Sequence, residues 1–439
     1  MIERDHIGIF GKMNAGKSTL MNLLTRQETS IVDPTPGTTA DVKSELLEIH
    51  GIGPVKVFDT AGLDERKDLG GKKKRRTLQV LKECDLVLLV IDPGRQDVGA
   101  EIELLEAARD QDKQVLIVFN LFKEGDKDRI GALYSAIDLL KFYRPLSIRA
   151  NDPEQGPALL RFLLREYRSR NAPMELFPFV HRDTTYVLVI PMDPETPQGR
   201  LLRPQQMAVE YITRKYAYPS CFRLDLEKAR DPGRNRDEQR RFLEYVNGFA
   251  QRPGAIITDS QAIDIMARWC PGDIALTTFS ITMIQFVSQG KLQEFARGLA
   301  CVPALKPGDR VLIVEACNHT RIREDIGTVQ IPRYFSKHFP GVVLEHNFGR
   351  EFQENSALSA YALIIHCGGC MISHQKLQAR IRDLDAVGVP YTNYGLLLSY
   401  LQGRDVLGKV LEPWGIRLRS GEQGRPEIDA HSNGAAAHP

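Results

Sequence analysis

Residues 11–18 read GKMNAGKS, and they constrain the fold of this chain more than any other feature. They directly follow a short apolar run, Ile7–Phe10, and precede a helical pattern over Thr19–Thr25. A strand, a loop of the form G-x-x-x-x-G-K-[ST] and a helix, in that order, form a phosphate-binding loop. The alternative is a chance glycine turn before a helix, and the order of the three parts argues against it. The sequence therefore predicts a nucleoside triphosphate site here.

The residue types of this loop suit the binding of phosphate. Gly11 and Gly16 leave room for backbone N–H groups to wrap around phosphate oxygens. Lys17 is placed to reach the outer phosphates, and the hydroxyl of Ser18 is placed to hold Mg²⁺. The other predicted nucleotide-binding residues of this segment are Asn14, Ala15 and Thr19.

Two further segments complete the predicted hydrolytic site. In residues 59–62 (DTAG), the Asp59 carboxylate is expected to contact Mg²⁺ and the N–H of Gly62 to meet the γ-phosphate. Residues 36–39 (PGTT) lie in a polar loop suited to a switch that orders around the metal, with Thr39 as a Mg²⁺ ligand. The predicted catalytic residues are therefore Lys17, Thr39, Asp59 and Gly62.

These motifs resemble the GTPase domain of the TrmE/Era/EngA group over roughly residues 1–170. The resemblance implies that Asn14 holds an activating K⁺ ion, because those relatives use an asparagine at this place in the loop. Leu63 stands where Ras-like proteins have a glutamine that orients the attacking water, so we expect slow intrinsic hydrolysis. A K⁺ ion would supply charge that an arginine supplies in other GTPases.

The segment that should read guanine departs from this group. Its members have Asn-Lys-x-Asp after the corresponding strand, whereas residues 120–123 here read NLFK. Asn120 is kept as a nucleotide-binding residue, but Lys123 replaces the base-reading carboxylate, and Asp126 comes three residues too late. Residues 147–150 (SIRA) match the second base-contacting loop only loosely. The sequence thus predicts triphosphate binding without predicting selectivity for guanine.

Cysteines and histidines gather after two later apolar runs. Cys317 and His319 follow the predicted strand 310–316, and residues 366–370 (HCGGC) follow the predicted strand 361–365, with 46 residues between His319 and His366. The carboxyl ends of parallel strands share one edge of a sheet, so we expect these side chains to converge. Cys-x-x-Cys thiolates select zinc or an iron–sulfur cluster. A closed Cys₃His zinc site and a chance grouping of unliganded thiols are the alternatives.

The two motifs together, behind a GTPase-like domain, resemble the HydF family of GTPase and scaffold proteins for FeFe-hydrogenase maturation, over about residues 5–403. The resemblance implies that Cys317, Cys367 and Cys370 hold a 4Fe-4S cluster, with His319 or His366 as candidate fourth ligand. It also implies a homodimer, a transient diiron precursor as cargo, radical-SAM maturases as suppliers and apo FeFe-hydrogenase as recipient. Further segments that agree with the family are 257–261 (ITDSQ), 276–280 (LTTFS), 325–327 (DIG) and 392–395 (TNYG).

Alternating apolar runs and helical patterns predict an α/β protein in several parts. We expect a P-loop GTPase domain over 1–170, a linker over 171–183, a middle α+β dimerisation domain over 180–260 and an α/β iron–sulfur domain over 263–405. The segment 411–439 is expected to be a disordered tail. The remaining cysteines, which lack partners at ligand spacing and are expected to pack in cores, are Cys84, Cys221, Cys270 and Cys301.

The composition of the 439 residues excludes several classes of function. A net charge of +2 gives no broad footprint for nucleic acid or anionic membrane, and no apolar run is long enough to span a bilayer. The run 72–76 (KKKRR) reads as a solvated helix face or a docking surface for a partner. With no signal peptide and seven cysteines, we expect a cytoplasmic protein with reduced thiols. The alternative function is an RNA- or ribosome-associated switch GTPase with a structural zinc site.

Overall fold

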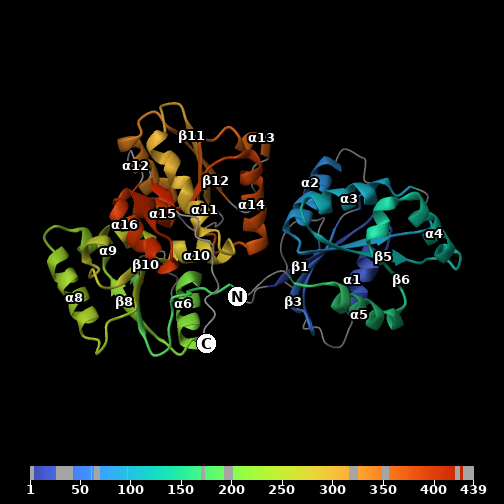
Figure 1. Cartoon of the computed structure of the whole chain (residues 1–439), viewed down its shortest axis with the longest axis horizontal. Coiled ribbons are helices and arrows are strands. Elements are labelled where there is room, and N and C mark those ends of the chain that lie inside the picture. Colours follow the sequence, from blue (N-terminus) through green and yellow to red (C-terminus); the bar gives the residue numbers. More distant parts are fainter. Residues whose placement is uncertain are drawn as a thin grey trace. The chain divides into compact units, whose positions relative to one another are not determined.

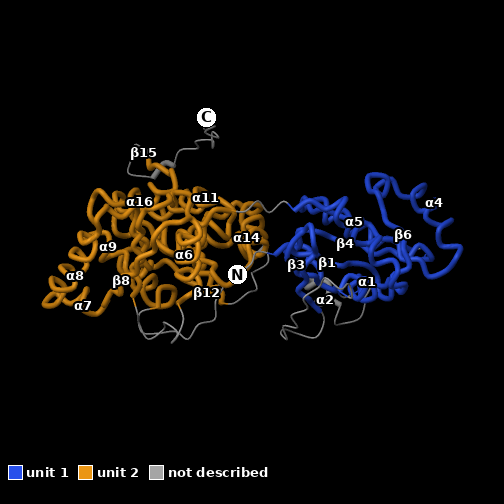
Figure 2. Tube along the Cα trace, turned by 90° about the horizontal axis from the view of Figure 1, so that it is seen from below, with its two compact units in different colours: residues 1–173 blue, residues 174–439 orange. Residues whose placement is uncertain are grey.

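The computed structural model divides into two compact units, Met1–Pro173 and Met174–Pro439 (Figures 1 and 2). No helix in the described part of the chain is long and apolar enough to cross a membrane. The residues that the structure describes are 4–25, 43–60, 62–63, 70–95, 97–169, 174–191, 201–315, 325–348, 355–420 and 426–428.

The first unit is built on a six-stranded sheet of order β2-β3-β1-β4-β5-β6, in which only the β2–β3 pairing is antiparallel. Its strands are β1 (Asp5–Phe10), β2 (Lys43–Ile49), β3 (Gly53–Asp59), β4 (Leu86–Ile91), β5 (Gln114–Asn120) and β6 (Leu146–Ile148). Its helices are α1 (Lys17–Thr25), α2 (Gly70–Glu83), α3 (Gly99–Asp110), α4 (Asp126–Ala136) and α5 (Gly156–Glu166).

Helices cover both faces of this sheet, as the fully buried strands β1 and β4 require (Figure 1). On one face, Leu20 of α1 and Leu159 of α5 pack in a cluster with β1 and β4. On the other face, Leu81 of α2 and Leu104 of α3 pack in a second cluster. The α/β class predicted for this part of the chain is confirmed. The basic run 72–76 lies in α2, and its side chains are outside the described residues.

The second unit contains two four-stranded sheets, both parallel throughout. The first has the order β10-β9-β7-β8, with β7 (Thr185–Pro191), β8 (Tyr218–Leu224), β9 (Ala255–Thr258) and β10 (Ala275–Thr278). Its helices are α6 (Arg203–Arg214), α7 (Leu226–Arg230), α8 (Asn235–Asn247), α9 (Ile263–Trp269) and α10 (Phe279–Val287). Each strand returns to the same direction through a helix, so this sheet is of the α/β type where the sequence predicted α+β.

The second of these sheets has the order β12-β11-β13-β14. Its strands are β11 (Arg310–Glu315), β12 (Val343–Phe348), β13 (Leu363–His366) and β14 (Tyr391–Asn393). Its helices are α11 (Leu292–Arg297), α12 (Ile331–His338), α13 (Asn355–Leu358), α14 (His374–Val387), α15 (Tyr394–Leu401) and α16 (Arg404–Leu411). One hydrophobic cluster contains residues of both sheets, such as Ile256 and Ile313, and so joins them.

Three sequence-based expectations about this unit differ from the structure. The expected linker is not free of the core, because Leu176 and Phe177 are buried against the first sheet. The strand β10 lies beyond the expected domain boundary at 260–263 but belongs to the sheet of the middle part. The expected disorder after 411 is wrong for residues 412–420 and 426–428, where Trp414 donates a hydrogen bond to Thr277 and two short strands pair.

Candidate functional site

The phosphate-binding loop connects β1 to α1, as predicted, and turns at Gly16, whose φ is +98°. A Cβ atom on Gly16 would lie 2.1 Å from the Nδ2 atom of Asn120, so only glycine fits this close approach. Asn14 also adopts a left-handed conformation, with φ of +62°. The predicted nucleotide-binding residues of this segment therefore all lie in the loop or the first turn of α1: Gly11, Asn14, Ala15, Gly16, Lys17, Ser18 and Thr19.

The charged and hydroxyl groups of the loop are arranged for phosphate and Mg²⁺. The buried ammonium group of Lys17 donates hydrogen bonds to the carbonyl oxygens of Gly11 (3.1 Å) and Lys12 (2.8 Å). The hydroxyl of Ser18 donates to Oδ2 of Asp59 at 2.5 Å. The other carboxylate oxygen of Asp59 is buried and accepts no hydrogen bond from the described residues. A hydroxyl and a carboxylate meeting in this way form the kind of all-oxygen donor set that Mg²⁺ prefers.

The DTAG segment lies against the same loop. A Cβ atom on Gly62 would be 2.8 Å from the backbone nitrogen of Met13, and the N–H of Leu63 donates to the carbonyl oxygen of Gly11 at 3.3 Å. The structure thus brings together the predicted residues Lys17, Asp59 and Gly62. Thr39 and the rest of the predicted switch 36–39 lie outside the described residues.

Asn120 ties the base-binding edge of the unit to the phosphate-binding loop. Its buried side chain donates to the carbonyl oxygen of Ala15 (3.0 Å) and accepts from the N–H of Ala150 (2.9 Å). Asp126 does not replace the missing base-reading carboxylate, because its Oδ2 atom accepts the backbone N–H groups of Phe122 and Lys123, both at 2.8 Å, and the residue is buried. Lys123 itself is exposed at this edge.

A buried ion pair that the sequence did not predict connects the loop to α3. Lys12 lies 3.0 Å from Asp97 and 3.6 Å from Glu101, and both Lys12 and Glu101 are buried. Burial raises the pKa of the Glu101 carboxyl, and the nearby Lys12 ammonium opposes that rise. The motif allows any residue at position 12, so its pattern does not signal that this lysine will meet acidic residues 85 and 89 positions further along the chain.

The cysteine-bearing loop lies at a place where the sheet topology favours ligand sites. The chain crosses from β11 to β12 on one side and returns to β13 on the other, so β11 and β13 are neighbours at a topological switch point. Open α/β sheets bind ligands at such points, outside the carboxyl ends of the strands. His366 pairs with Val314 and Asn393, so β11, β13 and β14 end at one edge, as predicted.

We call residues 367–370 (CGGC) the thiol loop. It turns at Gly369, whose φ is +68°, and leaves Cys367 and Cys370 half-buried. Arg203 donates a hydrogen bond to the carbonyl oxygen of Cys370. Cys317 and His319, which follow β11 in sequence, lie outside the described residues.

The chemistry of the donors present fits a soft metal or cluster. Two thiols, separated by two glycines, lie at the edge where the chain bearing Cys317 also leaves β11, and neither Cys367 nor Cys370 forms a disulfide. Within the described residues no three His, Cys, Asp or Glu side chains form a complete metal site. The strand edge beneath the thiol loop is held by hydrogen bonds: Asn393 donates to the backbone and hydroxyl oxygens of Ser280, both at 3.0 Å.

His366 is buried beneath the thiol loop, and the two nitrogens of its ring have different neighbours. Nδ1 lies 2.7 Å from the carbonyl oxygen of Cys367, and Nε2 lies 2.8 Å from a guanidinium nitrogen of Arg380. Next to this edge, Tyr394 donates to Glu315 at 2.9 Å, and burial raises the pKa of its hydroxyl well above the ordinary range. The sequence did not predict a role for Arg380, which lies on α14.

The other cysteines behave in three ways. Cys84 and Cys270 are buried, as expected of packing residues, and burial raises the pKa of both thiols. Cys301 is half-buried, and burial raises the pKa of its thiol to about 11. Cys221 is exposed, so the prediction that it packs in a core is wrong.

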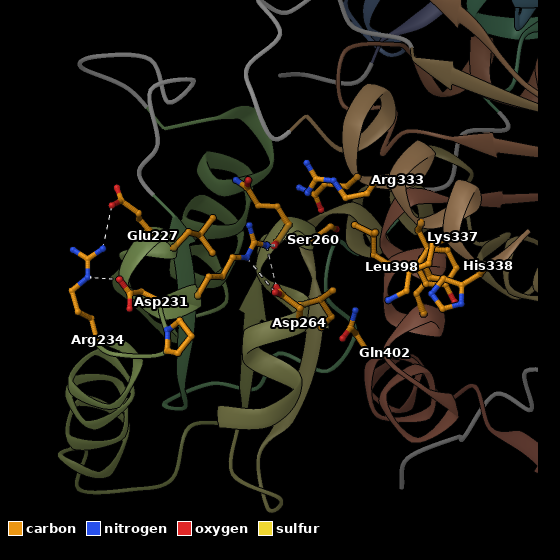
Figure 3. A pocket seen from close by; sticks show the side chains of 18 residues that line it. Glu227, Asp231, Arg234, Ser260, Asp264, Arg333, Lys337, His338, Leu398 and Gln402 are labelled. Atoms are coloured by element: carbon orange, nitrogen blue, oxygen red, sulfur yellow. Dashed lines mark hydrogen bonds and ion pairs between the residues drawn. The ribbon is translucent and has the colours of Figure 1, made fainter. Parts of the chain in front are cut away.

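A separate hollow of about 1190 Å³ lies between the carboxyl edge of the first sheet of this unit and α12 (Figure 3). The carboxylates that line it form ion pairs with arginines on the same side of the hollow. Arg230 contacts Asp264 at 3.2 Å, and Arg234 contacts Asp231 at 2.8 Å. The thiol loop does not line it, so the hollow is a different feature from the site described above.

The protein families that match this chain cover separate segments, and the two sites lie in different segments. Residues 6–121 match the family described as 50S ribosome-binding GTPase. Residues 237–287 match the hydrogen maturase F dimerization domain, and residues 293–413 match the hydrogen maturase F tetramerization domain. The phosphate-binding loop lies in the first match and the thiol loop in the last, so the predicted P-loop GTPase domain is confirmed.

Two curated relatives match segments of 135 and 136 residues. GTPase Der from Nitratiruptor sp. is 34% identical over 135 residues, which cover 28% of this chain and 29% of that protein. The tRNA modification GTPase MnmE from Natranaerobius thermophilus is 38% identical over 136 residues, 29% of this chain and 28% of that protein. The chain thus spans less than a third of the length of these relatives. The match to a solved structure of an Era variant from Aquifex aeolicus covers 50% of this chain and 93% of that chain, with 19% identity and a TM-score of 0.32.

Proposed function

Because the chain belongs to the hydrogen maturase F family, we propose that it hydrolyses GTP and serves as an iron–sulfur scaffold that delivers a diiron precursor to apo FeFe-hydrogenase. One observation carries this proposal: a phosphate-binding loop with paired Ser18 and Asp59 and a thiol loop at a switch point occur in one chain. The dimerization and tetramerization domains indicate that the chain associates with copies of itself, and we propose a homodimer as the basic unit.

In the first unit, the residues of the site divide the work of binding and hydrolysis. Lys17 exchanges its loop carbonyl partners for the outer phosphate oxygens, while Ser18 and Asp59 hold the metal, together with Thr39. Mg²⁺, when bound, offsets the charge that develops on the phosphates. The N–H of Gly62 meets the γ-phosphate. Hydrolysis is slow unless K⁺ is present, because the neighbouring Leu63 has no amide to orient water.

In the second unit, Cys317, Cys367 and Cys370 hold a 4Fe-4S cluster. When bound, the cluster supplies one iron with an exchangeable position, which is what a scaffold needs to accept a metal cargo and release it. His319 and His366 are the candidate ligands for that position. The half-buried state of Cys367 and Cys370 supports this role, because a cargo must reach the thiol loop from solvent.

The exchange of cargo takes place between proteins. Radical-SAM maturases supply the diiron precursor, and apo FeFe-hydrogenase receives it, in the cytoplasm. GTP binding and hydrolysis control these encounters and leave the cluster chemistry to the thiol loop, since the residues for hydrolysis lie wholly in the first unit.

The test is the metal content of protein purified without oxygen. Wild type should be brown, with iron and sulfide near four of each per chain, and should show an EPR signal on reduction. Cys367→Ser should lose the cluster but keep GTP hydrolysis. Cys221→Ser is the matched control, because that cysteine is exposed and distant in sequence, and it should behave as wild type. Stoichiometric zinc without sulfide would overturn the scaffold and favour a switch GTPase with a structural zinc site.

A further inference from the structure

The hydrogen bonds of His366 determine which of its ring nitrogens carries the proton. A guanidinium group has no acceptor, so Arg380 must donate to Nε2, which therefore presents its lone pair. The carbonyl oxygen of Cys367 can only accept, so Nδ1 must carry the hydrogen. Both nitrogens are already engaged, and the ring is 3% exposed.

This arrangement changes the role of His366 in the scaffold. An imidazole binds a metal through a nitrogen lone pair, and the only lone pair here is directed at a buried cation. To become a ligand, His366 would have to leave Arg380, a residue that is itself 2% exposed and would lose a hydrogen bond in the interior. The Cys367 carbonyl would lose its partner as well. A ligand role would therefore cost two hydrogen bonds, one of them buried and the other partly buried.

We propose that His366 is a positioning residue rather than the fourth ligand, and that it links Arg380 to the backbone of Cys367. This inference rests on the proposed function, since it concerns how the chain holds its cluster. The link fixes the position of the Cys367 carbonyl. Because the carbonyl and the thiol belong to the same residue, it also restricts the direction in which the thiol points. Arg380 comes from α14, which begins four residues after Cys370, so the element that follows the thiol loop also supports it from below.

The proposal gives Arg380 a second, electrostatic effect. A 4Fe-4S cluster with three thiolates is negative, and reduction adds one more negative charge. A fixed cation one side chain away stabilises the reduced form more than the oxidised form, and burial strengthens the effect. Arg380 therefore holds the reduction potential above the value it would have without this charge. Outer groups of this kind commonly change metal affinity by about 10- to 100-fold.

The experiment compares variants on one helix. Arg380→Met removes the charge and the donor, Arg380→Lys keeps the charge, and Arg382→Met removes a cation two residues further on, a step of about 200° that faces away from His366. Each protein is reconstituted anaerobically and measured for iron, sulfide, thermal melting, GTP hydrolysis and the midpoint potential of the EPR signal. Arg380→Met should shift the potential downward and lose iron about 10-fold faster to a chelator. Arg382→Met should match wild type, and Arg380→Lys should lie between.

The ligand question is answered by the nitrogen hyperfine coupling of the reduced cluster. The nitrogen coupling of His366→Gln should equal that of wild type, although His366→Gln should lose its cluster faster. Loss of a wild-type coupling in His366→Gln alone would overturn the positioning role, as would an Arg380→Met protein with the potential and iron retention of Arg382→Met. If Arg380→Met fails to fold in the melt, Arg380→Lys and His366→Gln still decide the matter. Wild type without iron and sulfide would instead overturn the proposed function itself.

Discussion

The loss of the base-reading carboxylate can be reversed by one substitution, Lys123→Asp. Asn120 is already held in place by Ala15 and Ala150, and Asp126 accepts two backbone N–H groups, so Asp126 does not take the place of the missing base-reading carboxylate. Wild type should therefore bind GTP and ITP with similar affinity, because the two differ only in the 2-amino group that such a carboxylate would recognise. Lys123→Asp restores an acceptor at the position where the resembling GTPases have one.

The magnitude follows from the number of hydrogen bonds gained. ITP lacks one donor relative to GTP, and a hydrogen bond to a charged group contributes about 1.5–3 kcal/mol. At 1.4 kcal/mol per factor of ten, the ratio of GTP to ITP affinity should rise roughly 10- to 130-fold in Lys123→Asp. GTP binding should tighten more than ITP binding, because the new carboxylate can accept from N1–H and the 2-amino group of guanine but only from N1–H of the base in ITP.

Competition of GTP, ITP and ATP against a fluorescent nucleotide measures these ratios directly. Lys127→Asp is the matched control, because it makes the same charge change at an exposed position on α4. That variant should keep the wild-type ratios. A wild-type preference for GTP over ITP of about 10³ or more would refute the reasoning, because another group would then read the base. An unchanged ratio in Lys123→Asp would refute it as well.

Three further results are expected of the first unit. Lys17→Ala should abolish nucleotide turnover, measured as phosphate release, because the described site has no other cation placed to reach the outer phosphates. Replacing Na⁺ by K⁺ should raise the rate of hydrolysis, and Asn14→Ala should remove this difference between the two salts. Equal rates of the wild type in the two salts would refute the assignment of Asn14 as a K⁺ ligand. Gly16→Ala should destabilise the unit by about 1–3 kcal/mol in a thermal melt, because its φ is +98° and the new Cβ would meet Asn120 at 2.1 Å; an unchanged melt would contradict the close contact.

The sequence predicted best those parts in which local pattern and topology agree. The apolar run 86–91 is the strand β4 to the residue, and the segment 11–18 joins a strand to a helix as its motif requires. The convergence of the loops after β11, β13 and β14 followed from one rule, that parallel strands end at the same edge, and His366 does pair with Asn393 there.

The parts that sequence reasoning missed depend on contacts distant in the chain. Leu176 and Phe177 lie in a proline-bearing stretch that reads as a linker, yet burial of their side chains draws the stretch into the core. Trp414 follows a helix in a segment of low hydrophobicity, but it packs near Phe179 and is bonded to Thr277. In neither segment does local composition reveal the surface that receives the aromatic ring.

His366 shows why spacing alone could not assign roles within the cysteine motif. In sequence it stands next to Cys367, and a histidine beside a Cys-x-x-Cys segment reads as one more ligand. Its partner Arg380 lies fourteen residues away on a helix, and nothing in the spacing signals that the two will meet. Only the packing of α14 against β13 shows that the ring nitrogens are engaged.

The thiol loop combines a rigid base with an accessible top, and this combination separates a scaffold from a closed metal site. Below the loop, His366 and Asn393 are buried and hydrogen-bonded to neighbouring elements. Above them, Cys367 and Cys370 remain half-buried. A structural zinc site gains its stability by enclosing the metal in four protein ligands, so it has no reason to keep its thiols accessible. A scaffold must keep its own cluster while another metal group arrives and leaves, and a fixed base under partly exposed thiols meets both requirements.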